Sequence, residues 1–258
     1  MGPPASNDKL VSMNIDAPEI RALRAKVRAA DEEFYDALAC HEAWKPAAYD
    51  KALHARIGRS YAGNTFLVLR QMLRRGMVLS LMHLWDTDKR AVGMGSIANA
   101  LGDKRILAAL TAEGAARFGK PHPSRLDHIE KAMGEDLRHS AAEAIAIIRK
   151  YEEGGSSHAT FTKLKTWRDE HLAHRQINPK PIEASDQDTL DEAIEAFYQD
   201  MSMLIRLLLH VVEKTANDPE QTAEVYAHCA TFFWASVCGE RTKGHPQYRS
   251  PPARRNAL

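Results

Sequence analysis

Arg168, His171 and His174 are the residues of this sequence whose types and spacing best suit chemistry. At about 100° and 1.5 Å per residue of an α-helix, the three side chains fall within an arc of roughly 120° along about 9 Å of axis. A guanidinium carries a permanent charge and forked donors that match phosphate oxygens, while an imidazole, with an unperturbed pKa of about 6.5, exchanges protons near neutral pH. This set suits RNA cleavage without a metal ion: a neutral histidine accepts the proton of a ribose 2′-OH, and Arg168 stabilises the charge that develops at phosphorus.

The same residues have two other interpretations. Arg, Asp, Glu and His along a helix commonly form solvated i,i+3 and i,i+4 pairs. His171 and His174, together with Glu170, offer donors at adjacent turns that a metal ion uses. The His-Glu-x-x-His order of zinc enzymes is absent, however, and no further strong ligand cluster accompanies them. We therefore expect neither a metal site nor a cofactor.

The charge of the chain is balanced overall but uneven along its length. With 35 Lys and Arg against 34 Asp and Glu, the whole chain is not a polycation, so any anion site is local. Residues 154–181 hold five basic and two acidic side chains, whereas residues 182–224 hold eleven acidic and two basic ones. These runs are typical of solvated faces on neighbouring helices. The alternative is a basic patch that binds an anionic substrate through Lys163, Lys165 and Arg175.

Composition places the chain among ordinary globular proteins. Hydrophobic residues make up 44% and charged residues 27%, which excludes a wholly disordered, collagen-like or disulfide-stapled chain. Ala and Leu far outnumber Val, Ile and Thr, and this bias favours helices. The three cysteines have no metal-binding spacing and their odd number fits a reducing cytoplasm. Residues 1–8 lack the pattern of a signal peptide, and arginines interrupt the apolar stretch 66–85, so we expect neither export nor a membrane span.

Helix periodicity and helix boundaries predict an all-α fold. We expect one helical domain over residues 16–238, a flexible N-terminus over 1–15 and a flexible C-terminal tail over 239–258. Pro46 should end the first helix near residue 45, and the apolar run 67–84 should form a buried central element. Gly154 to Ser157 should form a linker. The expected helices cover residues 16–45, 49–85 with a bend at 58–63, 96–117 as one helix or a pair, 124–152, 159–176, 185–217, and a last helix opened by Asp218 and Pro219.

The motif segment resembles a known family. Arg168-Asp169 followed by His174 matches the signature of the HEPN superfamily (higher eukaryotes and prokaryotes nucleotide-binding), in which Arg and a polar residue are followed by four to six intervening residues and then His. The string Trp-Arg-Asp-Glu-His-Leu-Ala-His-Arg resembles its abortive-infection AbiU-like branch. So do the upstream stretches Leu79-Ser-Leu-Met-His-Leu-Trp-Asp86 and Gly95-Ser-Ile-Ala-Asn-Ala-Leu101. Together these stretches extend the resemblance over roughly residues 20 to 215.

The resemblance implies a HEPN-like bundle of up-and-down helices with a short helix that carries the motif. Such a bundle dimerises so that the motif helices of two chains face one cleft. Many HEPN proteins are metal-independent endoribonucleases of toxin systems or phage defence. By resemblance, Arg168 and His174 are catalytic, Asp169 orients them, and His171, which is extra to the signature, assists or lies beside the cleft.

Two functions from different classes follow from this resemblance. The first is a cytoplasmic, homodimeric endoribonuclease that cuts RNA by 2′-OH attack. The second is a non-catalytic RNA- or nucleotide-binding assembly module of the same fold. A nucleotidyltransferase-like antitoxin is a further expected partner of the first.

Overall fold

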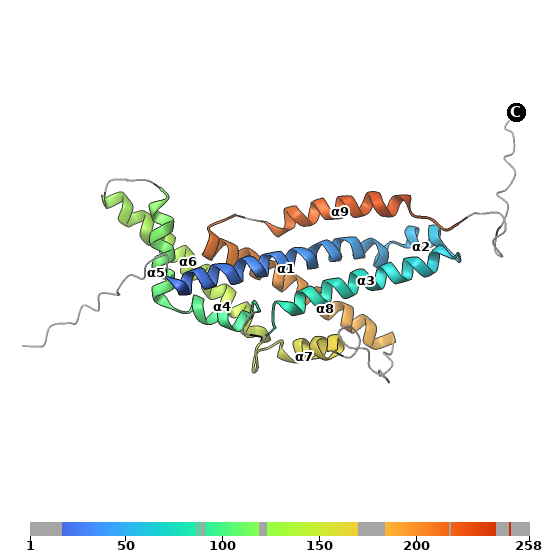
Figure 1. The fold of residues 1–258 in the computed structure, drawn as a ribbon, viewed down its shortest axis with the longest axis horizontal. Coiled ribbons are helices and arrows are strands. Elements are labelled where there is room, and N and C mark those ends of the chain that lie inside the picture. Colours follow the sequence, from blue (N-terminus) through green and yellow to red (C-terminus); the bar gives the residue numbers. More distant parts are fainter. Residues whose placement is uncertain are drawn as a thin grey trace, which may run out of the picture. The chain divides into compact units, whose positions relative to one another are not determined.

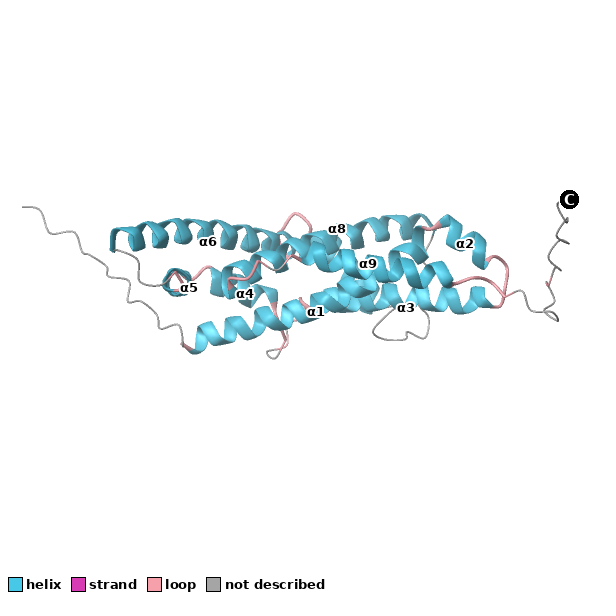
Figure 2. Ribbon diagram, turned by 90° about the horizontal axis from the view of Figure 1, so that it is seen from above, coloured by secondary structure: helices cyan, strands magenta, loops and turns pink. Residues whose placement is uncertain are grey.

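The computed structural model describes residues 17–86, 88, 91–118, 123–169, 184–216, 218–240 and 248, and the regular elements within these residues are all helices (Figures 1 and 2). The prediction of an all-α fold is confirmed. The helices are α1 (Pro18–Tyr49), α2 (Lys51–Ile57), α3 (Ala62–His83), α4 (Met94–Leu101), α5 (Lys104–Ala116), α6 (Pro123–Tyr151), α7 (His158–Trp167), α8 (Ala184–Leu208), the π-helical turn η2 (Leu209–Glu213) and α9 (Pro219–Ser236).

The chain forms two compact units. Unit 1 comprises Met1–Tyr35 and Val78–Pro219, and unit 2 comprises Asp36–Met77 and Glu220–Leu258. The helices α1 and α3 each pass from one unit to the other. The prediction of a single helical domain over residues 16–238 therefore stays a prediction, and each unit is described by itself.

Unit 1 is organised around α6, which packs against α4, α5, α7 and α8 (Figure 1). Its apolar stripe consists of Leu137, Ala141, Ala144 and Ile148, all buried and spaced three or four residues apart. This spacing places the four side chains on one face of the helix, where they remove apolar surface from water. The predicted helices 96–117, 124–152 and 185–217 are observed as the pair α4 and α5, as α6, and as α8 with η2.

Ion pairs fix the first half of α1 within unit 1. Arg24 bonds Glu113 of α5 at 2.5 Å, and Arg28 bonds Glu213 of η2 through two nitrogens at 2.9 and 3.1 Å. A bidentate contact between a guanidinium and a carboxylate restricts orientation more strongly than a single bond does. These pairs set the rotation of α1 about its axis.

In unit 2, α1 continues through Pro46 to Tyr49, so the predicted end near residue 45 is wrong. A proline inside a helix removes one backbone hydrogen bond and opposes its continuation. Here Trp44, two residues before it, and Ala47, the next residue, are buried, and the Nε1–H of Trp234 donates to the Ala43 carbonyl at 2.8 Å. Burial and this extra donor offset the lost bond.

The predicted helix over 49–85 is two helices, α2 and α3, and the expected bend is a complete break. Gly58, with φ of +54°, ends α2, and its N–H bonds the His54 carbonyl. A positive φ strains residues with a β-carbon, so glycine suits this position. Asp50 caps the start of α2, since its carboxylate accepts from the N–H groups of Ala52 and Leu53.

The apolar run 67–84 is not buried throughout, which corrects the prediction of a buried central element. Its second half is in the core: Met77, Val78, Leu81, Met82 and Leu84 are at most 2% exposed. Its first half, in unit 2, exposes four apolar side chains by 40 to 56%, namely Leu67, Val68, Leu69 and Met72. The residues at helical spacing that face the unit 2 core here are Phe66, which directly precedes the run, and Leu73.

The start of the C-terminal segment is bonded to unit 2. The Gly239 N–H donates to the Arg56 carbonyl at 3.0 Å, and the Glu240 carboxylate accepts from the N–H groups of Tyr61 and Ala62. N–H groups at the first turn of a helix have no acceptor within that helix. Glu240 therefore caps α3 from a distant part of the chain. Residues 1–15, 241–247 and 249–258 of the predicted flexible ends lie outside the described residues.

We expect replacement of Glu240 by glutamine to lower the melting temperature at pH 7, because the amide accepts these two bonds more weakly than a carboxylate does. The N–H groups of Ala62 and Tyr61 lower the pKa of Glu240 from 4.5 to about 2. A carboxylate with a lowered pKa in the folded state stabilises above its unfolded pKa, and this contribution is lost as the pH falls from about 4.5 to about 2. The difference in melting temperature between the two proteins should therefore shrink over this range. A constant difference from pH 7 to pH 2.5 would contradict the role of charge, and Glu224→Gln, an exposed change on α9, is the control.

Candidate functional site

The motif helix α7 is placed by a tight turn after α6. Gly154 has φ of +84°, and a β-carbon on Gly155 would lie 2.2 Å from the Arg149 carbonyl oxygen. Only glycine fits both requirements without displacing the backbone. The Ser157 N–H bonds the Lys150 carbonyl at 2.9 Å and closes the turn. The predicted linker at residues 154–157 is thus observed, but as a fixed turn.

Arg168 and Asp169 form an ion pair at the end of α7. The Nε and Nη2 groups of Arg168 both donate to Oδ1 of Asp169, at 2.8 and 2.6 Å. The Arg168 side chain is 19% exposed and that of Asp169 is 44% exposed. Because one carboxylate oxygen takes both bonds, Asp169 fixes the direction of the guanidinium, and the remaining N–H donors of Arg168 have no partner among the described residues.

The other predicted site residues fall into two groups. Lys163 and Lys165 are exposed on α7, as residues of a basic patch would be. His171, His174 and Arg175 lie outside the described residues, as does the end of the predicted helix 159–176. Of the predicted site residues, Arg168 and Asp169 are thus joined by an ion pair, and Lys163 and Lys165 precede them on α7.

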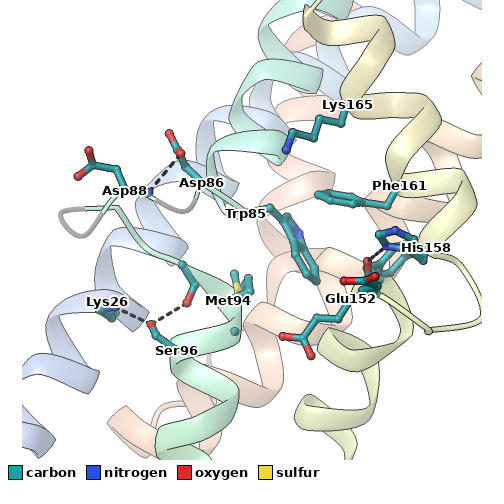
Figure 3. Close-up of a pocket in the computed structure, with 14 residues that line it drawn as sticks. Lys26, Trp85, Asp86, Asp88, Met94, Ser96, Glu152, His158, Phe161 and Lys165 are labelled. Carbon is teal, nitrogen blue, oxygen red and sulfur yellow. Dashed lines mark hydrogen bonds between the residues drawn. The ribbon is translucent and has the colours of Figure 1, made fainter.

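Lys165 also lines a cavity of about 590 Å³ in unit 1 (Figure 3). The cavity lies between α1, the loop from α3 to α4, the start of α4, the turn after α6, and α7. It is lined by Lys26, Trp85, Asp86, Asp88, Gly93, Met94, Gly95, Ser96, Tyr151, Glu152, Glu153, His158, Phe161 and Lys165. Its volume falls in the range of about 300 to 1,000 Å³ that is typical of small-molecule sites.

Aromatic rings form one wall of this cavity. The rings of Trp85 and Phe161 have centroids 5.0 Å apart, and Tyr151 lies edge-on to Trp85 at 5.7 Å. The indole Nε1–H of Trp85 donates to the sulfur of Met201 at 3.4 Å, which ties the polar edge of the ring to α8. Trp85 is half-buried, and in Figure 3 its ring stands at the centre of the cavity wall. Such an arrangement offers an aromatic surface of fixed orientation.

Asp200 of α8 holds the end of α6 that forms the cavity floor. Its Oδ2 accepts from the Tyr151 hydroxyl and, at 2.5 Å, from the Lys150 ammonium. Burial and the bond to Asp200 raise the pKa of the Tyr151 phenol, so the phenol stays protonated and donates. This shared acceptor fixes the position of Glu152, the next residue in the chain.

Several residues of the cavity were not predicted as site residues from the sequence. Trp85, Asp86 and Asp88 line the same cavity as Lys165. Glu152 and Phe161 carried no signal in the sequence. The Gly154-Gly155 pair could have indicated them, because a tight turn after α6 must bring the residues that flank it to the start of α7.

The described residues hold no group of three or more His, Cys, Asp and Glu side chains that is arranged to bind a metal ion. Within the same residues, no helix is both long enough and apolar enough to cross a membrane.

Comparison with known proteins gives one family. A family model described as AbiU2, of the HEPN type, matches residues 20–232, which is most of the chain. A comparison with curated proteins and a comparison with solved structures each gave no match. The matched range includes the turn after α6, the motif helix and every residue that lines the cavity.

Proposed function

This chain belongs to the AbiU2 family of HEPN proteins, and from this membership we propose that it is a metal-independent endoribonuclease that acts on RNA in phage defence or as a toxin. Membership of a HEPN family indicates a nucleotide-binding, ribonuclease-like or abortive-infection role. The proposal adds the reaction and the residues that perform it.

The observation that carries the proposal is the oriented, largely buried guanidinium of Arg168 at the end of α7. Arg168 binds the scissile phosphate with the donors that Asp169 leaves open, and it stabilises the negative charge that develops on the phosphate oxygens. Lys163, Lys165 and Arg175 bind neighbouring phosphates of the RNA.

His174 acts as the general base in this proposal. Its neutral imidazole accepts the proton of the ribose 2′-OH, the 2′-oxygen attacks phosphorus, and the bond from phosphorus to the 5′-oxygen breaks. The leaving 5′-oxygen takes a proton from a protonated imidazole, which His174 of the partner subunit supplies in a homodimer. The products are a 2′,3′-cyclic phosphate and a 5′-hydroxyl, and His171 assists or lies beside the site.

The direct test is cleavage of single-stranded RNA by the purified protein in the presence of EDTA, with end-group analysis of the products. We expect 2′,3′-cyclic phosphate and 5′-hydroxyl ends from the natural protein and no cleavage by the Arg168→Ala, His174→Ala double variant. Undiminished cleavage by the double variant would refute the assignment. An electrophoretic shift of RNA by the natural protein without any product would instead support the non-catalytic binding module. Repeating the assay in the presence of the product of a neighbouring reading frame tests for an antitoxin.

A further inference from the structure

We propose that the cavity between α4, α6 and α7 binds a guanine base of the RNA, and so gives the enzyme a preference for the nucleotide at the site of cleavage. This inference rests on the proposed function, because it assigns a subsite of the same active site. It draws on the shape of the cavity, on the polar groups that remain available in it, and on its distance along α7 from Arg168.

The aromatic wall suits a planar ring. A base stacked on an aromatic side chain contributes about 1 to 3 kcal/mol to the binding of single-stranded nucleic acid. Trp85 is held by its bond to Met201 and by its contact with Phe161, so its position is set before a ligand arrives. A binding surface that is ordered in advance loses less entropy when it binds.

Several polar groups of the cavity are already engaged. The Ser96 hydroxyl donates to the Gly93 carbonyl at 2.7 Å and accepts from the Lys26 ammonium at 2.5 Å. His158 Nδ1 donates to the Tyr151 carbonyl at 3.2 Å, and its Nε2 faces the Thr162 hydroxyl. These groups position the cavity and are not its main contacts to a ligand.

Glu152 and Lys165 are available to a ligand. Neither side chain has a hydrogen-bond or ion-pair partner among the described residues. Glu152 lies against the first turn of α4, where a β-carbon on Gly95 would approach its Oε1 to 2.9 Å. The absence of a side chain at Gly95 therefore leaves room for this carboxylate. In Figure 3 Glu152 lies on the floor of the cavity, below Trp85, and Lys165 reaches in from α7 on the other side.

A carboxylate on one side of a planar ligand and an ammonium on the other match guanine. Guanine has two adjacent donors, N1–H and N2–H, which fit the two oxygens of one carboxylate, and its O6 and N7 are acceptors for an ammonium. Adenine, cytosine and uracil each place an acceptor directly beside the donor on their pairing edge. A carboxylate facing one of these bases would meet a lone pair, and this repulsion selects against them.

The position of the cavity on α7 connects it to the proposed cleavage. Lys165 and Arg168 are three residues apart, so they are neighbours on the surface of one helix. A guanine bound beside Lys165 thus brings its own backbone phosphate towards the guanidinium of Arg168. The preference that we infer is for cleavage next to guanosine.

The test is isothermal titration of the four nucleoside 5′-monophosphates, which contain no internucleotide bond to cleave, into the full natural chain. We expect GMP to bind at least tenfold more tightly than AMP, CMP or UMP. Glu152→Gln, which keeps the shape but replaces one acceptor by a donor, should weaken GMP binding by about 10- to 100-fold, as expected for the loss of a bidentate base contact. The control Glu135→Gln, at an exposed carboxylate of α6 that lines no part of the cavity, should change it less than twofold.

A second variant keeps the inference testable if Glu152→Gln disturbs the fold. Gly95→Ala crowds the Glu152 carboxylate and should weaken GMP binding without removing any polar group. Three results would overturn the inference. They are equal binding of the four nucleotides, no effect of Glu152→Gln on GMP binding, and displacement of GMP by spermidine that itself binds as tightly as GMP. If GMP fails to bind while the natural protein cleaves RNA, only the guanine subsite is wrong. If GMP binds as expected and RNA is not cleaved, only the proposed function is wrong.

Discussion

Replacement of Arg168 by alanine is expected to lower the rate of RNA cleavage by about 100- to 1,000-fold, because one oriented donor to a developing charge contributes this much in comparable sites. The helical content and the melting temperature should change little, since the guanidinium bonds Asp169 on the adjacent residue and an ion pair that is partly exposed contributes about 1 kcal/mol or less. Single-turnover cleavage of a defined RNA and circular dichroism measure the two quantities.

The shape of the guanidinium matters as well as its charge. Asp169 holds Nε and Nη2 of Arg168 through a single oxygen, an arrangement that a lysine ammonium cannot reproduce. We therefore expect Arg168→Lys to recover only a minor part of the lost rate, and Asp169→Asn to lower the rate by a smaller factor than Arg168→Ala. If Arg168→Lys cleaved RNA at the natural rate, the site would need only a positive charge at this position.

A matched control separates this effect from the general loss of an arginine. Arg105 in α5 bonds the carboxylate of Asp103, close to it in sequence, just as Arg168 bonds Asp169, but it is far from α7 in the chain and lines no part of the cavity. Arg105→Ala should leave cleavage within twofold of the natural rate. A loss equal to that of Arg168→Ala would indicate that net charge, and not the position of the guanidinium, controls cleavage.

Local signals in the sequence predicted the helices well, and long-range contacts explain the errors. Asp218 and Pro219 open α9 as expected, because a cap and a first-turn proline act within a few residues. Pro46 was wrongly expected to end the first helix, since Trp44 and Ala47 gain more from burial in unit 2 than the helix loses at the proline. The exposure of Leu67 was also missed, because hydrophobic periodicity identifies a helix but not which part of a long apolar run meets a partner element.

The same distinction between local signals and long-range contacts applies to the candidate site. Arg168 and Asp169 were found because they belong to one short stretch with a recognisable order of residue types. The cavity beside them was not found, since it joins Trp85 to Glu152 and Lys165 across more than sixty positions of the chain. Only the packing of α4, α6 and α7 brings these side chains together, and no spacing in the sequence records that packing.

Replacement of Trp234 by alanine should have the largest effect on stability. Trp234 is 3% exposed in the core of unit 2, its ring packs edge-on against Phe66 at 5.6 Å, and its indole N–H bonds the Ala43 carbonyl beside Pro46. Removing a buried tryptophan costs about 3 to 5 kcal/mol, because the lost apolar contacts leave a cavity. We expect a decrease of this size in the free energy of unfolding, measured by urea denaturation, with the earliest gain of amide hydrogen exchange in residues 36–77.

The neighbouring aromatic residue provides the comparison. Phe233 is 54% exposed and loses little packing when truncated, so Phe233→Ala should cost about 1 kcal/mol or less. Similar losses for the two adjacent variants would mean that the second face of α9 is covered in solution, since an exposed phenylalanine cannot contribute as much as a buried tryptophan. A large loss for Trp234→Ala alone would show that the buried face of α9 stabilises unit 2, and the bond from Trp234 to the Ala43 carbonyl connects this stabilisation to the stretch of α1 that continues through Pro46.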